Sequence, residues 1–238
     1  MENKRSLLKC DRVYVTDKLY VRIPSVGEIL EDEERYLKMV NSLTAVPYQY
    51  MVQLDDMKID FTIMKDYDLF MMIFMSYVKE DLSIIFDNLD VSDFSIEQNS
   101  NECFLYSKNN DIVIDEGVYT SFVELIRKIY NIEKFKYKVA NEKTRKYLID
   151  RERKRQKRHS KEKYVPYLEK IIIALVNNRD FKYDYDDVMD LSYYRFNQSF
   201  IQIQTNITFD KTMQGVYAGT VDTSKLKDKS CLSWIQTK

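Results

Sequence analysis

The chain has 238 residues, a net charge of −1 and 45% apolar residues, which is enough to bury a sizeable core and excludes a disordered chain. Its four glycines and three prolines argue against an all-β sandwich and against Gly-rich phosphate loops, so helices should dominate. Cys10, Cys103 and Cys231 lie far apart without CxxC spacing, so neither a disulfide framework nor a zinc site is indicated.

The N-terminal part is expected to combine a hairpin with helices. Residues 12–23 alternate β-branched and aromatic residues with polar ones and predict a short hairpin. Ser25 and Glu28 have the spacing of a capping box, and the apolar periodicity after them predicts a helix from about residue 27 to residue 43. Pro47 suits the first turn of a second helix.

The most apolar stretch is Asp66 to Leu89, which contains seven consecutive apolar residues from Leu69 to Met75. A helix that is apolar on every side is buried all round or pressed against a partner, and this run is far shorter than the roughly 20 residues of a membrane span. We therefore predict a central helix capped by Asp66, continuing as one long or two shorter helices.

Residues 91–115 show a different periodicity. Short apolar runs around residues 94–96, 104–106 and 112–114 are separated by Asn/Ser/Lys turns, which predicts a three-stranded meander. Asp115 is then placed to cap an amphipathic helix that reaches Ile129.

A basic segment follows, with eleven Lys/Arg against four Asp/Glu between Asn141 and Lys163, a local charge of +7. It begins as an amphipathic helix at Tyr147 and Leu148 but has no apolar residue from Asp150 to Ser160, so this half must be solvated or bound. The candidate basic patch consists of Arg151, Arg153, Lys154, Arg155, Lys157 and Arg158.

The C-terminal part is predicted to be helical. One helix should have Pro166 in its first turn, Asp184 and Ser192 should cap two more, and a last short helix should end near Gly219. The chain then finishes with three apolar residues that could dock back or meet a partner: Leu232, Trp234 and Ile235.

The predicted fold class is α+β and predominantly helical, with an N-terminal hairpin and helices, a small antiparallel meander and a helical C-terminal part. The pattern divides the chain into a mainly helical part (1–90), a meander plus helix (91–140), a basic helical connector (141–163) and a C-terminal helical part (164–238).

The residues give no sign of catalysis. Acid–base chemistry usually needs a histidine in a pocket, and the one histidine, His159, lies in the solvated basic run. The pairs Asp55/Asp56 and Asp186/Asp187 lie near inferred helix ends, where carboxylates complement the helix dipole. We expect no enzyme, no catalytic residue, no metal and no cofactor.

Several blocks of the chain resemble a family of proteins encoded among the tail genes of tailed phages that infect low-GC Gram-positive bacteria, usually regarded as tail assembly chaperones. The likeness rests on YVRIPSVGEILEDEERY, SLTAVPYQYMVQLDDMKIDFT, NNDIVIDEGVY, FKYDYDDVMDLSYYRFNQSF, MQGVYAGTVDTSKL and LSWI. It implies a non-enzymatic protein that binds the tape-measure protein, tail-tube subunits or both before the tail polymerises. The motifs define no binding residues.

We therefore expect a protein of the bacterial host cytoplasm that binds other proteins through apolar helical surface, with self-association left open. The candidate contact residues are Met71, Met72, Met75, Leu232, Trp234 and Ile235. Two alternatives remain: a nucleic-acid-binding module that uses the basic helix 143–163, which is less favoured because aromatic residues occur only at its edges, and a structural component of the virion. No segment predicts a signal peptide or a membrane span.

Overall fold

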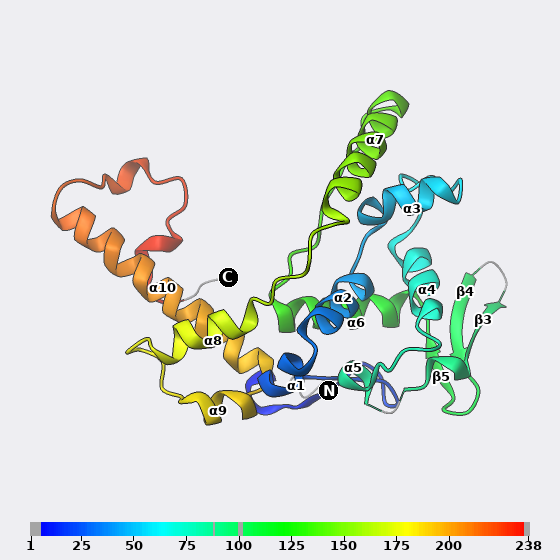
Figure 1. Cartoon of the computed structure of the whole chain (residues 1–238), viewed down its shortest axis with the longest axis horizontal. Coiled ribbons are helices and arrows are strands. Elements are labelled where there is room, and N and C mark those ends of the chain that lie inside the picture. Colours follow the sequence, from blue (N-terminus) through cyan, green and yellow to red (C-terminus); the bar gives the residue numbers. More distant parts are fainter. Residues whose placement is uncertain (1–5, 88, 100–101, 236–238) are drawn as a thin grey trace. The chain divides into compact units, whose positions relative to one another are not determined.

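The structure is a computed structural model and describes residues 6–87, 89–99 and 102–235. Helices hold 56% of the described residues and two small antiparallel sheets hold the strands, which confirms the predominantly helical α+β class (Figure 1). The chain forms two compact units: the first is Met1–Pro24 with Glu31–Pro166, and the second is Ser25–Leu30 with Tyr167–Lys238. The expected segment boundaries near residues 90 and 140 lie inside the first unit.

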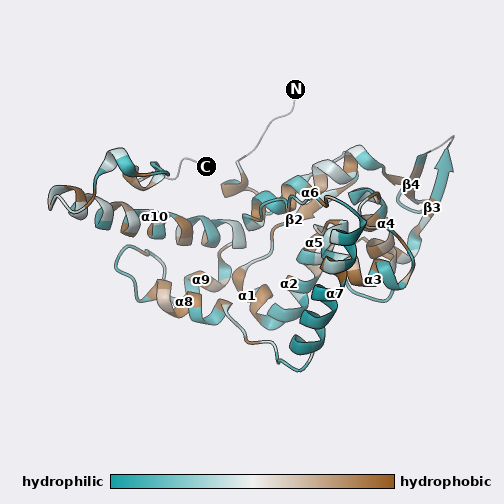
Figure 2. Ribbon diagram, turned by 90° about the horizontal axis from the view of Figure 1, so that it is seen from above, coloured by the Kyte–Doolittle hydropathy of each residue, from teal (hydrophilic) through white to brown (hydrophobic). Residues whose placement is uncertain are grey.

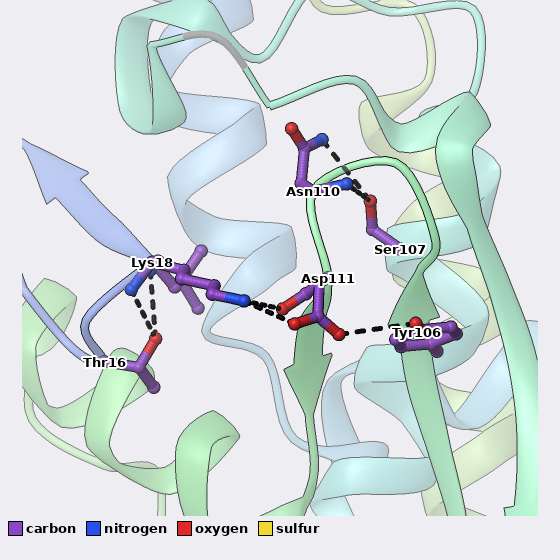
Figure 3. Close-up of polar contacts among 7 residues, drawn as sticks. Thr16, Lys18, Tyr106, Ser107, Asn110 and Asp111 are labelled. Carbon is purple, nitrogen blue, oxygen red and sulfur yellow. Dashed lines mark hydrogen bonds and ion pairs between the residues drawn. The ribbon is translucent and has the colours of Figure 1, made fainter.

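The first unit opens with the predicted hairpin. After the 3-10 turn η1 (Leu7–Lys9), strand β1 (Arg12–Tyr14) pairs antiparallel with β2 (Tyr20–Arg22). The Lys18 ammonium at the hairpin turn donates to the Asp111 carboxylate at 2.5 Å and to its carbonyl oxygen at 3.2 Å (Figure 3). This contact lowers the pKa of the Asp111 carboxyl, chiefly through the Lys18 hydrogen bond, and ties the hairpin to the turn before β5.

The helix predicted for residues 27–43 is divided. Helix α1 (Val26–Glu31) ends before Asp32, and Asp32 accepts a hydrogen bond from the Arg35 N–H at 3.1 Å to begin α2 (Glu33–Leu43). A new cap inside the periodic stretch restarts the helix, which periodicity alone does not predict. The second predicted helix is present as the 3-10 turn η2 (Pro47–Tyr50), which begins at Pro47, followed by α3 (Met51–Asp56).

The central apolar stretch forms two shorter helices, α4 (Asp66–Ser76) and α5 (Ser83–Phe86). The predicted cap is one residue off, because Lys65 occupies the N-cap position and Asp66 is the first helical residue. Asp66 and Asp68 place two carboxylates in the first turn, where their negative charge interacts favourably with the positive end of the helix dipole.

The predicted meander is present and follows the 3-10 turn η3 (Val91–Asp93). Strands β3 (Phe94–Asn99), β4 (Glu102–Ser107) and β5 (Ile112–Ile114) pair antiparallel in that order. Asp115 caps α6 (Glu116–Tyr130) as expected, accepting a hydrogen bond from the Val118 N–H at 2.8 Å.

An aromatic core joins these elements in the first unit. Phe74 of α4 meets Phe86 and Phe94 edge-on at centroid distances of 6.2 and 5.2 Å, and Phe86 stacks on Phe122 of α6 at 5.1 Å. Tyr67 donates from its hydroxyl to the Ile114 carbonyl at 2.5 Å, and burial raises the pKa of Tyr67 to about 12. The central helix therefore packs between α6 and the meander.

The basic segment forms helix α7 (Glu142–His159), capped by Asn141, whose side chain accepts from the Thr144 N–H at 2.9 Å. The predicted amphipathic start is present in part: Leu148 packs against the buried cluster that contains Ile149 of α7 with Val52 and Leu54 of α3, whereas Tyr147 is 63% exposed. Helix α7 lies beside α3 (Figure 1).

The second unit contains α8 (Leu168–Val176), α9 (Tyr185–Asp190) and α10 (Tyr193–Tyr217), with the 3-10 turns η4 (Thr223–Lys225) and η5 (Ser230–Leu232) in its tail. Pro166 lies just before the N-cap of α8, Tyr167, rather than in the first turn. Asp184 caps α9 as predicted. Ser192 occupies the N-cap of α10 without a side-chain cap bond.

Two features of this unit differ from expectation. The last helix ends near Gly219 as predicted but is not short, because α10 runs without a break for 25 residues. Helix α1 also belongs here: the Val26 N–H donates to the Leu191 carbonyl at 2.9 Å, and Ser25 bridges Ser192. Residues far apart in sequence thus share one unit.

Candidate partner-binding surfaces

The methionines of α4 divide between core and surface. Met71 is buried, so it contributes to the core of the first unit rather than to a contact surface. Met72 is 38% exposed and Met75 is half-buried. Helix α4 packs on α2 and α6, and Phe70 and Ile73 beside Met71 are buried as well. Only Met72 and Met75 of the three can meet a partner without unfolding.

The C-terminal apolar residues lie largely in solvent. Leu232 is half-buried, whereas the side chains of Trp234 and Ile235 are 60% and 53% exposed. The Gln202 side-chain amide donates to the Trp234 carbonyl at 2.6 Å, and η5 packs on α10. The backbone of the tail is therefore held while its indole is presented to solvent, a geometry that lowers the entropy cost of binding.

Helix α10 carries further unburied apolar surface. Of its 25 residues only Phe196 and Ile203 are buried, and brown apolar positions alternate with teal polar ones along it (Figure 2). Ile207 is 45% exposed and Tyr217 is 82% exposed. Because a helix of a globular protein normally buries an apolar stripe, this helix has more apolar surface than the described second unit covers.

The basic patch of α7 is partly engaged inside the protein. Arg153 donates to Asp56 at 2.7 Å and to Asp55 at 2.9 Å, so these paired aspartates hold α7. Arg155 pairs with Glu152 at 2.8 Å, and Arg158 donates to the Lys154 carbonyl at 3.3 Å.

The remaining charges of the patch point outward. Among the described residues, Arg151, Lys154 and Lys157 have no acidic partner within ion-pair distance, and all three side chains are exposed. Figure 2 shows α7 as a largely hydrophilic helix. Its outer face therefore attracts anions.

A second anchor holds the start of α7. Arg145 pairs with Asp60 at 2.6 Å and with Glu142 at 2.8 Å. Burial by itself would raise the pKa of Asp60, but hydrogen bonds from Thr62 and Arg145 outweigh it and lower that pKa.

Sequence reasoning missed an aromatic cluster beside α7, which we define as Tyr48, Phe61, Phe135 and Tyr137. The Tyr48 ring lies 5.0 Å from Phe135 and 5.0 Å from Tyr137, and it meets Phe61 edge-on at 5.9 Å. Phe135 is 46% exposed. The alternation in FKYKV at residues 135–139 was the available signal, but Tyr48 is distant in sequence and no spacing rule connects it.

Among the described residues, no group of three His, Cys, Asp or Glu side chains is placed to hold a metal ion. His159 is exposed and lies 2.7 Å from the Glu162 carboxylate. The open depression lined by Asp32, Arg35 and Lys38 has its charges paired locally, with Lys38 on Glu34 and Arg35 on Glu80.

Comparison with protein families gave a match for the C-terminal part of the chain. Residues 156–237 match the family described as the YomV second domain, a phage-derived family of Bacillus phages and prophages, which suggests a phage protein. The matched region spans all of α8, α9 and α10 and the tail. No curated protein and no solved structure matches the chain. Within residues 6–87, 89–99 and 102–235, no helix is both long and apolar enough to cross a membrane.

Proposed function

We propose that this protein is a phage tail assembly chaperone that binds the tape-measure protein, tail-tube subunits or both in the host cytoplasm. One observation carries the proposal: the Trp234–Ile235 end is held on α10 by its backbone while both side chains stay in solvent. This surface lies within the region that matches a phage-derived family. Aromatic residues presented in this way are typical centres of protein–protein interfaces.

The chemistry of the other surfaces is consistent with reversible binding. Ile207 and Tyr217 extend the apolar surface along α10, and Met72 offers an unbranched side chain that repacks against different shapes. The outer charges of α7 would speed encounter with an acidic partner and would contribute less to the final affinity. Catalysis has no part in the proposal.

Co-expression with the neighbouring tail genes, followed by pull-down from the tagged chain, tests this function. We expect capture of the tape-measure or tail-tube protein, and we expect Trp234→Ala with Ile235→Ala to reduce capture at least tenfold, since hot-spot aromatics contribute about 2 kcal/mol or more. The matched control is Ile63→Ala, which removes an apolar side chain that is 83% exposed in the first unit. Capture should be unchanged in that control.

Failure to capture either tail protein, when both are soluble, would defeat the chaperone proposal. Mass spectrometry of purified virions distinguishes a chaperone from a structural component of the virion. A chaperone leaves the particle, whereas a structural component stays in it at a fixed copy number. Equal loss of capture in Ile63→Ala and in the tail variant would remove the tail as the contact surface.

A further inference from the structure

The aromatic cluster has an exposed ring supported from behind. Phe135 lies on Tyr48 with an angle of 30° between the rings, and Tyr48 in turn contacts Phe61 and Tyr137. The Tyr137 hydroxyl donates to the Phe61 carbonyl at 3.4 Å. The Phe135 ring is supported by Tyr48 on one side, and 46% of the side chain remains in solvent. The cluster therefore offers a fixed aromatic ring to an incoming group.

This ring lies within the most basic part of the chain. Residues 131–163 contain fourteen Lys/Arg and five Asp/Glu, a net charge of +9 in a chain whose overall charge is −1. Lys134 and Lys136 flank Phe135 in sequence; Lys134 pairs with Asp66 at 2.7 Å, whereas Lys136 is exposed without an acidic partner among the described residues.

Helix α7 connects the cluster to the free charges. Tyr48 and Tyr137 pack against the buried cluster that contains Ile149 of α7, so α7 lies beside the aromatic cluster, and Arg155 lies within electrostatic range of Tyr48. Arg151, one helical turn before Arg155, lies next to it on the helix surface, and Lys154 lies with Arg151 on the outer face. Neither Arg151 nor Lys154 has an acidic partner in the part of the chain that the structure describes.

We propose that Phe135, supported by Tyr48, and the α7 side chains Arg151, Lys154 and Arg155 form a binding site for single-stranded nucleic acid. An exposed ring beside a basic track matches the two interactions that single strands offer, base stacking and phosphate attraction. A duplex keeps its bases stacked internally and cannot use the ring. An acidic peptide would satisfy the charges but offers a planar group only where an aromatic residue occurs, whereas every nucleotide of a single strand carries one.

This site does not depend on the tail-protein surface, because all its residues lie in the first unit and the Trp234 surface lies in the second. Either proposal can therefore fail while the other stands. The site also corrects the sequence-based objection that the basic helix lacks aromatic neighbours, since the rings come from residues 48 and 135–137.

Fluorescence anisotropy with the full chain and a labelled oligothymidine of about 16 nucleotides is the direct test. We expect binding at about 50 mM salt that weakens steeply by about 200 mM, and much weaker binding of a duplex of the same length. An oligouridine probe should bind comparably, because stacking tolerates different bases and sugars.

Substitutions separate stacking from charge. Phe135→Leu keeps an apolar side chain against Tyr48 but removes the ring, and it should weaken oligothymidine binding roughly tenfold without changing the salt dependence. Phe135→Tyr should retain affinity. Arg151→Gln with Lys154→Gln should weaken binding and flatten the salt dependence, whereas the charge-matched control Lys79→Gln with Lys108→Gln should change neither property.

Three results would overturn the site. The first is no single-strand binding by the folded chain at low salt. The second is wild-type affinity in Phe135→Leu together with equal affinity for duplex, which would leave only general electrostatic attraction. The third is binding of labelled polyglutamate but not of oligothymidine, which would assign the surface to an acidic protein.

Discussion

Gly215 shows how one residue sets the course of the tail. It lies in the last turn of α10, and a Cβ atom there would approach Val221 Cγ2 to 2.6 Å. The backbone N–H groups of Thr220 and Val221 both donate to the Gly215 carbonyl, at 2.9 and 3.1 Å. The chain after α10 thus turns back directly over a position where only glycine leaves room.

We predict that Gly215→Ala loosens this turn without unfolding the rest of the chain. Contacts below 3.0 Å are not accommodated by a stiff β-branched side chain, so the Thr220 and Val221 amides should lose hydrogen-exchange protection. Adding Val221→Ala removes the clashing methyl group and should restore protection. Unchanged exchange in the single variant would show that the turn adjusts without cost.

Asp60 provides a pH-dependent anchor for α7. Its pKa is lowered in the folded state by hydrogen bonds from Thr62 and Arg145, against the opposing effect of burial. A carboxyl with a depressed folded-state pKa stabilises the protein above its unfolded pKa of about 4, and this contribution disappears as pH falls through the folded-state value.

We therefore expect Asp60→Asn to lower the free energy of unfolding at neutral pH and to make its decline on acidification shallower than in the wild type. Urea unfolding between about pH 6 and pH 3 measures both effects. Asp17→Asn, at an exposed position with no ion-pair partner among the described residues, is the control and should follow the wild-type curve. Parallel curves for Asp60→Asn and wild type would contradict the prediction.

At the scale of elements, α7 combines an apolar anchor with a charged one. Ile149 is 4% exposed within the cluster that includes Val52 and Leu54. Arg153 meets Asp55 and Asp56, but all three side chains are more than 40% exposed, so solvent screens this interaction. The apolar contact should therefore dominate the docking of the helix.

Substitution of the apolar anchor should therefore lower the free energy of unfolding more than substitution of the charged anchor. Ile149→Ala should cost about 2–5 kcal/mol of unfolding free energy, whereas Arg153→Gln should cost no more than about 1 kcal/mol. Arg151→Gln, on the outer face, should lie within about 0.5 kcal/mol of wild type. Urea denaturation of the full chain measures all three. A larger loss for Arg153→Gln than for Ile149→Ala would mean that charge holds α7.

Elements with strong local patterns could be predicted from sequence, and their long-range contacts could not. The meander and the cap at Asp115 follow from period-two runs and a helix N-terminal signal. The helix break at Asp32 is not predicted from the sequence, because the apolar periodicity continues through it. The exposure of Met72 beside the buried Met71 depends on which helices cover α4, and composition carries no such information.

In the candidate sites, too, local features could be predicted from sequence and long-range contacts could not. The solvated half of α7 was predictable, because a helix without apolar residues cannot enter a core. The aromatic cluster was not, because Tyr48 and Phe135 come together only when residues 131–141 pack near η2. The apolar residues of the tail indicate a contact site from sequence, but their exposure and the anchoring through Gln202 are visible only in the structure.

At the scale of the whole molecule, the chain does not divide at a single point. Residues 25–30 belong with residues 167–238, although they are followed by more than a hundred residues of the first unit. The Val26 N–H bonds to the Leu191 carbonyl, and Gly27 approaches Met189 so closely that a Cβ would lie 3.1 Å from its carbonyl oxygen. The second unit thus requires a segment from near the N-terminus, which no local pattern indicated.

This arrangement predicts that two matched substitutions destabilise different parts of the molecule. Val26 and Val40 are at most 1% exposed and are separated by fourteen positions, but Val26 lies in the second unit and Val40 in the first. Changing either to Ala removes two buried methyl groups and should cost on the order of 2 kcal/mol. In Val26→Ala the loss of hydrogen-exchange protection should fall mainly on α9 and α10, and in Val40→Ala on α4 and α6. If both variants lost protection in the same elements, the chain would unfold as one cooperative body, and the assignment of α1 to the C-terminal unit would carry no energetic meaning.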